Sequence, residues 1–247
     1  MKTPKLRLDL ALVERGLSVT REQAQRAIMA GEVRIDDRVA TKASVMVTAE
    51  MNVAIAEQPK FVGRGGLKLE GALDSFALTV RDAVALDIGA STGGFTDCLL
   101  QRGAAKVYAI DVGHGQLAWK IRNDPRVIVR EKLNARYLSR ADIPEPIHVC
   151  VIDVSFISLT LILPNAFELL TPSGVLLALI KPQFELQPQE VGAGGIVSDP
   201  QLHEKAQARI RSFVTNAGNQ VVGVAPSVVR GTDGNQEFFL CARKQLA

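Results

Sequence analysis

Four ionisable residues, far apart in the chain, stand where they could carry out proton transfer. Lys181 directly follows six apolar residues, Val175–Ile180, that read as a buried strand, and Asp153 ends another such run. Lys68 opens a predicted helix after a Gly-Arg-Gly-Gly sequence, and Glu237 opens the last apolar segment. Burial and a second nearby cation both favour a neutral lysine amine, so Lys181 could accept a proton or, when charged, stabilise a forming oxyanion. Taken singly, each residue also fits an exposed charge at the end of a strand or helix.

A glycine-rich loop is the second chemical signature. The stretch Ala83–Thr96 (AVALDIGASTGGFT) reads as a strand, a loop and then a helix, and Gly89 would let the backbone turn. We expect Gly93 and Gly94 to leave room for a ligand to approach the backbone. The spacing is Asp-x-Gly-x-x-x-Gly-Gly, whereas nicotinamide-binding folds prefer Gly-x-Gly-x-x-Gly. A junction without a ligand, or one that binds a different nucleotide, is the alternative interpretation.

This loop resembles the S-adenosylmethionine site of class I methyltransferases. The resemblance implies that Asp87 lies beside the methionine ammonium group and that Asp111, which ends the next strand 24 residues later, binds the ribose. Asn134 follows the third strand, where such folds contact the adenine, and Phe95 either lines the methionine pocket or packs in the core. The predicted cofactor-binding residues are Asp87, Gly89, Ala90, Ser91, Thr92, Gly93, Gly94, Phe95, Asp111, Asn134 and Ala135.

The elements that must position these residues are apolar strands that alternate with helices from residue 84 onward. The predicted strands are Val84–Ile88, Lys106–Ile110, Val127–Val129, His148–Ile152, Val175–Ile180, Val221–Val224 and Glu237–Ala242. Near-continuous apolar runs indicate strands covered on both faces, and hence a doubly wound, mostly parallel α/β domain, which we place at residues 60–247. Ligands of such a fold bind off the carboxyl ends of the strands, where the four ionisable residues are predicted to lie.

Residues 1–59 are predicted to form a separate small α+β domain, joined to the rest by a linker at Gln58–Lys60. Two short helices, the second opened by a Thr20–Gln23 capping box and stopped by Gly31, precede a hairpin at residues 33–39 and a strand at Met51–Ala56. The order resembles the αL RNA-binding module of a ribosomal small-subunit protein, tyrosyl-tRNA synthetases and pseudouridine synthases. The matching residues are Arg7, Asp9, Leu12, Ser18, Arg21, Ala24, Ile28, Gly31, Val33, Val39 and Lys42. A generic packing unit is the alternative.

The charge is unevenly distributed. Residues 1–70 hold 12 Lys and Arg against 9 Asp and Glu, whereas the rest of the chain is balanced, which favours an anionic partner for the first part. The predicted RNA-binding residues are Arg7, Arg21, Arg26, Arg34, Arg38, Lys42 and Arg64. The stretch Lys120–Arg140 holds seven basic residues against two acidic ones, and could face a phosphate backbone or be a solvated surface.

Nearly the whole chain resembles the TlyA (haemolysin A) family of ribosomal RNA methyltransferases, whose catalytic domain is similar to that of the FtsJ RNA 2′-O-methyltransferases. The motifs that carry the resemblance are RGGLKL at 64–69, DVSFISL at 153–159, KPQFE at 181–185, GIV at 195–197 and GTDGNQEF at 231–238. The resemblance implies methylation of the 2′-hydroxyl of a ribosomal RNA cytidine by a Lys-Asp-Lys-Glu tetrad. Its members would be Lys68, Asp153, Lys181 and Glu237. Lys181 would be the base or the stabilising cation, oriented by Asp153, while Lys68 and Glu237 position the ribose.

Several classes of protein are disfavoured by what the sequence lacks. The 247 residues contain no uncharged apolar run long enough for a membrane helix and no secretion signal, so we expect a cytoplasmic protein without a membrane partner. Three widely spaced cysteines and three unclustered histidines predict reduced thiols and no metal site.

Three functional alternatives remain beside methylation of the ribose. One is a ribosome-assembly factor with a degenerate methyltransferase domain, which the intact glycine loop and tetrad disfavour. The second is methylation of a base, and base methyltransferases of this fold often use an Asn/Asp-Pro-Pro-aromatic motif where this chain has Asp153-Val154-Ser155-Phe156. The third is direct haemolysis. Because the chain extends little beyond its motifs, we expect large-subunit RNA, in the 50S particle, as the substrate.

Overall fold

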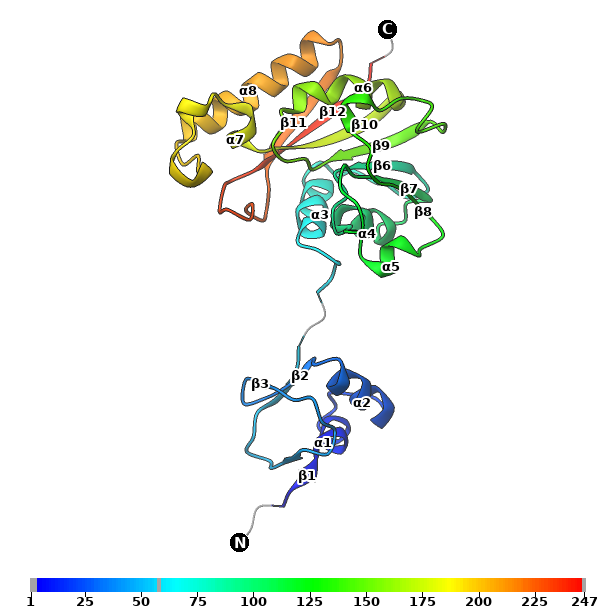
Figure 1. Cartoon of the computed structure of the whole chain (residues 1–247), viewed down its shortest axis with the longest axis vertical. Helices are drawn as coiled ribbons and strands as arrows, with labels where there is room; N and C mark the ends of the chain where they lie inside the picture. Colours follow the sequence, from blue (N-terminus) through cyan, green and yellow to red (C-terminus); the bar gives the residue numbers. More distant parts are fainter. Residues whose placement is uncertain (1–3, 57–58, 246–247) are drawn as a thin grey trace. The chain divides into compact units, whose positions relative to one another are not determined.

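The computed structural model describes residues 4–56 and 59–245 and divides the chain into two compact units, Met1–Pro59 and Lys60–Ala247 (Figure 1). Each unit has its own hydrophobic core. Of the expected linker Gln58–Lys60, Gln58 lies outside the described residues.

The first unit packs two short helices, α1 (Leu8–Glu14) and α2 (Arg21–Met29), against short strands. Leu8, Leu12 and Ile28 are fully buried in its core. β2 (Val33–Ile35) is the central strand of a three-stranded sheet, and a separate pair is formed by β1 and β4. The remaining strands are β1 (Leu6–Arg7), β3 (Arg38–Val39), β4 (Met46–Val47) and β5 (Val53–Ile55).

Local signals account for most of this unit. The Thr20 hydroxyl accepts a hydrogen bond from the Gln23 N–H at 3.2 Å and so caps α2. Gly31 follows that helix with a φ of 74°, in the left-handed conformation that stops a helix. Asp36 and Asp37 both have positive φ and form the turn between β2 and β3, which confirms the predicted hairpin. The two-residue strands β1 and β4 were not predicted, because two residues are too few to show an alternating pattern.

The second unit is built on a seven-stranded sheet in the order β11-β12-β10-β9-β6-β7-β8. The five strands from β6 to β10 run parallel, whereas β12 is antiparallel to both β10 and β11. The strands are β6 (Val84–Ile88), β7 (Lys106–Ile110), β8 (Val127–Arg130), β9 (Ile147–Ile152), β10 (Leu170–Ile180), β11 (Gln220–Pro226) and β12 (Phe238–Arg243). This mostly parallel sheet confirms the predicted α/β fold.

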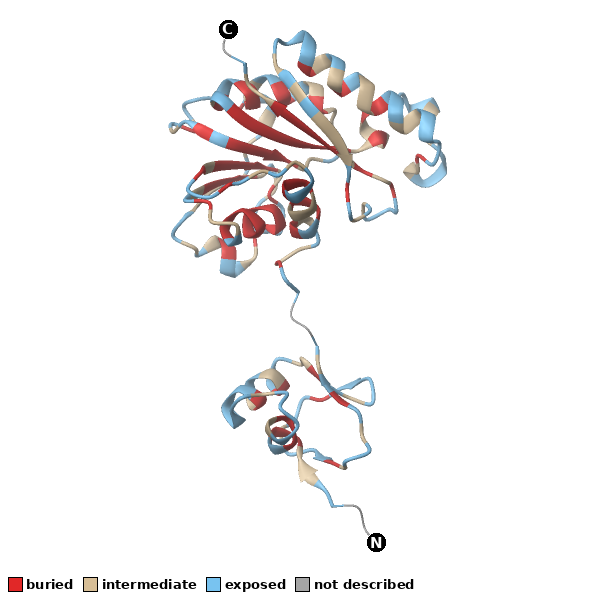
Figure 2. Ribbon diagram, turned by 180° about the vertical axis from the view of Figure 1, so that it is seen from behind, coloured by how far each residue is buried: buried red, intermediate tan, exposed pale blue. Residues whose placement is uncertain are grey.

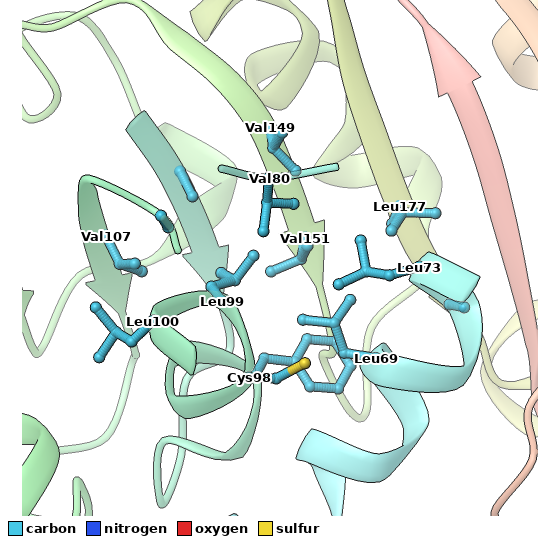
Figure 3. Packing of buried hydrophobic residues seen from close by; sticks show 14 of the residues in the cluster. Leu69, Leu73, Val80, Cys98, Leu99, Leu100, Val107, Val149, Val151 and Leu177 are labelled. Atoms are coloured by element: carbon cyan, nitrogen blue, oxygen red, sulfur yellow. The ribbon is translucent and has the colours of Figure 1, made fainter. Parts of the chain in front are cut away.

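Helices cover both faces of the sheet, so its central strands are buried (Figure 2). On one face, Leu69 and Leu73 of α3 (Gly65–Ser75) and Leu99 of α4 (Gly94–Gln101) pack against Val151 and Leu177 (Figure 3). The short α5 (Trp119–Arg122) lies on that face, and α6 (Leu163–Leu169) and α8 (Pro200–Asn216) lie on the other. Short helical turns complete the unit: α7 (Pro182–Glu185), η1 (Ala135–Tyr137), η2 (Leu159–Leu161), η3 (Pro188–Glu190) and η4 (Ala193–Gly195).

Several strand limits differ from prediction, and the starts of β10 and β12 are the differences that bear on the site. β10 begins at Leu170 rather than Val175, because Leu170 pairs with Ile147 before an irregularity shifts the register. β12 begins at Phe238, so Glu237 stands one residue before the strand and not within it.

Candidate active site

The four candidate catalytic residues lie at one edge of the sheet. Asp153 directly follows β9 and Lys181 directly follows β10, so both stand at the carboxyl ends of neighbouring parallel strands. β12 is antiparallel and pairs Phe238 with Ile180, which brings Glu237 to the same edge. Lys68 lies in the first turn of α3. The topology therefore assembles residues from four distant parts of the chain.

These residues form two ion pairs. Lys68 Nζ lies 2.5 Å from Glu237 Oε2, and the two residues are 9% and 2% exposed. Lys181 Nζ lies 2.6 Å from Asp153 Oδ1, a contact without hydrogen-bond alignment, and donates an aligned hydrogen bond to Ser155 Oγ at 2.9 Å. All four side chains line one cavity of about 220 Å³.

The loop before β12 shapes this cavity and holds Glu237. A Cβ at Gly231 would lie 2.7 Å from Glu237 Oε1, so a larger residue there would displace the carboxylate from its present position. Arg64 donates a hydrogen bond to Thr232 Oγ1 at 2.9 Å. Asn235 is buried, donates to the Gly195 carbonyl and accepts from the Val197 N–H, which joins two of the motifs seen in the sequence.

The glycine loop brings the ends of β6 and β9 together. Gly89 has a φ of 88°, and a Cβ there would lie 2.1 Å from the Asp153 carbonyl oxygen. The loop is also bonded to β7, because Asp111 accepts the Ser91 N–H on one carboxylate oxygen and the Gly113 N–H on the other, both at 2.7 Å.

A second cavity of about 460 Å³ adjoins the first at this loop. Asp111, Asn134 and Ala135 line it together with apolar side chains such as Ile110 and Leu133. The residues that border both cavities are Gly89, Ser91, Asp153, Ser155 and Phe156. Of the other predicted cofactor-binding residues, Ala90, Thr92, Gly94 and Phe95 line the first cavity.

Asp87 differs from its predicted placement. It is fully buried and lines neither cavity, because its Oδ2 turns inward and accepts a hydrogen bond from Thr96 Oγ1 at 2.6 Å. Burial raises the pKa of Asp87 to about 7 against the opposing effect of this hydrogen bond, and the nearby Asp153 contributes to the rise. Its other oxygen, Oδ1, is buried without a hydrogen-bond partner. The geometry therefore does not support direct contact between Asp87 and a ligand ammonium group.

Packing within the unit gives a further reason for glycine at positions 93 and 94. A Cβ at Gly94 would lie 2.9 Å from the Gly66 backbone nitrogen, and one at Gly93 would lie 2.9 Å from Leu117 Cδ1. Close packing of α3, and of Leu117 and Ile121 in and before α5, against the start of α4 therefore requires these glycines. Phe95 fits both of its predicted positions, since it lines the first cavity and packs 6.0 Å from the ring of Phe239.

Phe156 is a further site residue, to which the sequence motif at 153–159 assigns no role. It is 91% exposed, borders both cavities and has a φ of 64°, a conformation that bulky residues rarely adopt. Its ring lies 5.2 Å from that of Phe184. The sequence does hold a signal for this residue, because Phe156 comes directly after the Asp-Val-Ser that follows a predicted strand.

The predicted RNA-binding residues of the first unit fall into two groups. Arg7 and Arg21 bind the carboxylate of Asp9, which is fully buried, so part of their charge is neutralised within the unit. Arg38 and Lys42 border a surface hollow of about 540 Å³. Arg26 and Arg34 are exposed as well.

The basic stretch Lys120–Arg140 is partly neutralised by ion pairs. Lys120 lies 3.7 Å from Asp97, Arg126 lies 2.8 Å from Asp124, and Arg122 pairs with Glu131. The exposed basic residues that remain include Arg130, Lys132 and Arg136.

Within residues 4–56 and 59–245, no group of three or more His, Cys, Asp or Glu is arranged to hold a metal ion. Over the same residues, no helix combines the length and the apolar character needed to cross a bilayer.

Comparisons with known proteins match both units. The model of the FtsJ-like methyltransferase family matches residues 61–244, and that of the S4 domain matches residues 6–53. YqxC from Bacillus subtilis is 48% identical over 97% of this chain and 86% of its own length. The 16S/23S rRNA (cytidine-2′-O)-methyltransferase TlyA from Mycobacterium tuberculosis is 45% identical over 98% of this chain and 91% of its own. A solved structure described as a hemolysin from Streptococcus thermophilus is 43% identical, with a TM-score of 0.75 over 98% of this chain and 90% of that one.

Proposed function

The chain belongs to the FtsJ-like methyltransferase family, and we propose that it methylates the 2′-hydroxyl of a cytidine in ribosomal RNA, using S-adenosylmethionine. The observation that carries the proposal is the pair of joined cavities, one with two Lys–carboxylate pairs and the other with a carboxylate and apolar walls. Ribosomal RNA is the substrate named for the TlyA relative, and large-subunit RNA is our preferred target.

The second cavity suits a nucleoside cofactor. Asp111 has lone pairs left after accepting two backbone N–H groups, so it can also accept hydrogen bonds from a ribose diol. Apolar side chains beside Asn134 and Ala135 give a surface for a flat base. When bound, S-adenosylmethionine supplies the electrophilic methyl group. Asp153 and Ser155, which border both cavities, would be the residues that hold the reactive end of the cofactor next to the first cavity.

The first cavity suits the activation of a ribose hydroxyl. Such a hydroxyl is a poor nucleophile at neutral pH, so it must lose its proton or have its developing charge stabilised as it attacks. Lys181 takes the 2′-hydroxyl proton or, as a cation, stabilises the forming alkoxide. Asp153 orients the amine, and the Lys68–Glu237 pair positions the ribose.

The S4-like unit docks the RNA. Arg26, Arg38 and Lys42 offer exposed charge to phosphates, while Arg7 and Arg21 are held in fixed orientations by Asp9. The exposed ring of Phe156, at the border of both cavities, offers a stacking surface to a base turned out of the RNA.

Transfer of radiolabelled methyl from S-adenosylmethionine to purified 50S, 30S and 70S particles that lack the modification tests the proposal. We expect label in 50S-derived RNA, mapped to a 2′-O-methylated cytidine. Lys181→Ala should lower the rate by about 100-fold or more. The matched control is Lys205→Ala, which removes a lysine that pairs with Glu190 on the surface.

The possible outcomes separate the parts of the proposal. Label in both subunit RNAs would overturn the restriction to the large subunit. No label, with binding of the cofactor intact, would support an RNA-binding assembly factor instead. Methylation of wild-type rate by Lys181→Ala would exclude the role given to Lys181.

A further inference from the structure

Glu185 is a buried carboxylate that has no part in the reaction described so far. It ends α7, four residues after Lys181, and is 2% exposed. Its Oε2 accepts a hydrogen bond from Ser158 Oγ at 2.6 Å, and its Oε1 accepts one from the Leu159 N–H at 2.8 Å. Both donors belong to the segment that follows β9 and begins with Asp153. Glu185 therefore links the segment that carries Lys181 to the one that carries Asp153.

The Asp153–Leu159 segment contains a strained residue. Phe156 has a φ of 64°, in the left-handed region that disfavours a large side chain. Such conformations persist where the surrounding structure over-determines them, and they cluster at functional sites. The near end of the segment is held by Lys181 through Asp153 and Ser155, and the far end is held by Glu185.

Packing alone does not explain a carboxylate at this position. Withdrawal from water raises the pKa of Glu185 above its usual range, so burial is costly for the charged form. Arg209 of α8 donates a hydrogen bond to the Glu185 backbone carbonyl. This bond fixes the main chain at Glu185 and so helps to orient its side chain. An apolar side chain of similar size would fill the same space without this cost. The two hydrogen bonds that the carboxylate accepts, rather than its packing, therefore account for a glutamate at this position.

We propose that Glu185 is a positioning residue that fixes the Asp153–Leu159 segment relative to Lys181, so that Asp153, Phe156 and Lys181 face the first cavity together. The kinetic consequence rests on the proposed methyl transfer, whereas the structural consequence can be measured without it.

The kinetic test uses the full chain with Glu185→Ala, Glu185→Gln and Ser158→Ala, and expresses kcat per cofactor-binding site titrated with S-adenosylhomocysteine. We expect kcat to fall about tenfold for each hydrogen bond lost, with the KM for S-adenosylmethionine changed much less. Glu185→Gln keeps an acceptor for the Leu159 N–H and should retain more activity than Glu185→Ala. Glu190→Gln, which removes the charge that pairs with Lys205 and keeps an amide oxygen to accept the Gln187 N–H, is the matched control.

The structural test places a fluorophore on the segment. Trp119 is the one tryptophan of the sequence, so Trp119→Phe combined with Phe156→Trp reports on position 156 alone. Adding Glu185→Ala should change the acrylamide quenching of this tryptophan, whereas adding Glu190→Gln should not.

The outcomes distinguish the two proposals. Unchanged kcat per site together with unchanged quenching would overturn the role of Glu185, and if Glu185→Ala does not fold, Ser158→Ala decides by the same two readouts. Absence of methyl transfer by the wild-type chain would instead refute the proposed function, and the quenching result would still stand for or against Glu185.

Discussion

Lys68 Nζ and Glu237 Oε2 lie 2.5 Å apart although the two residues are separated by 169 positions in the sequence. The contact exists because β12 runs antiparallel to β10 and brings its first residues to the sheet edge where α3 begins. Since both side chains are nearly buried, the cost of removing each charge from water is offset mainly by the other. The pair therefore holds α3 to the last strand as well as lining the cavity.

Replacing one member of this pair should destabilise the protein more than replacing both. Lys68→Met or Glu237→Leu alone leaves a buried charge without its partner and should lower the free energy of unfolding by about 3–5 kcal/mol. The double variant should recover most of that loss yet remain inactive. Urea unfolding followed by circular dichroism, with methyl transfer measured in parallel, checks both expectations. Activity in the double variant would show that the pair is only structural, and the exposed Glu204–Arg211 pair, broken by Glu204→Gln, is the control.

Asp111 should control affinity for the cofactor. It accepts two backbone N–H groups and lines the second cavity, so Asp111→Ala removes both a ligand contact and the support of the glycine loop. We expect binding of S-adenosylhomocysteine to weaken by about tenfold or more, as measured by isothermal titration calorimetry. Asp142→Ala is a matched control, because Asp142 also accepts two hydrogen bonds, both from Ser139, in a loop outside the two cavities. Equal affinities of the two variants would contradict the assignment.

The sequence predicts most strands of the second unit and the common edge of the four candidate catalytic residues, because apolar runs and the charges beside them are local signals. The reason for Gly94 could not be predicted, since its contact with the Gly66 nitrogen depends on how α3 packs against α4. Likewise, the inward turn of Asp87 toward Thr96 depends on a χ angle that the loop spacing does not encode. Only the folded unit shows that Asp9 engages Arg7 and Arg21.

Asp9 should make the first unit sensitive to acid. Hydrogen bonds from Arg7, Gln25 and Arg21 hold the pKa of Asp9 well below its usual range. A carboxyl group with a depressed pKa in the folded state stabilises that state above its unfolded pKa of about 3.9, and the stabilisation is lost as pH falls further. Amide hydrogen exchange of α1 and α2 in the full chain should therefore show constant protection from about pH 5 to 8 and a decline below about pH 4.

Asp9→Asn should lower the protection of α1 and α2 by about 2 kcal/mol at neutral pH. In this variant the decline in protection below about pH 4 that Asp9 causes should be absent. Asp37→Asn, in the exposed hairpin turn, serves as the control. A decline of the same size in the Asp9→Asn variant would show that other carboxyl groups cause it.

Asp87 should have the opposite effect in the second unit. Its pKa is raised to about 7 in the folded state, against about 3.9 when unfolded. Between these pH values the folded state keeps a proton that the unfolded state has lost, so Asp87 makes the folded state less stable as pH rises.

Asp87→Asn does not titrate and keeps an acceptor for the Thr96 hydroxyl. Relative to the wild type, its free energy of unfolding should be unaffected by pH below about 4, rise toward pH 7 by on the order of 2–4 kcal/mol, and then level off. Urea unfolding at pH 4, 5.5 and 7.5, with exposed Asp82→Asn as the control, measures this difference directly. If the difference in the free energy of unfolding between the variant and the wild type does not change over this pH range, Asp87 is ionised throughout. The charge on its buried carboxylate would then be stabilised by the glycine loop and not removed by a bound proton.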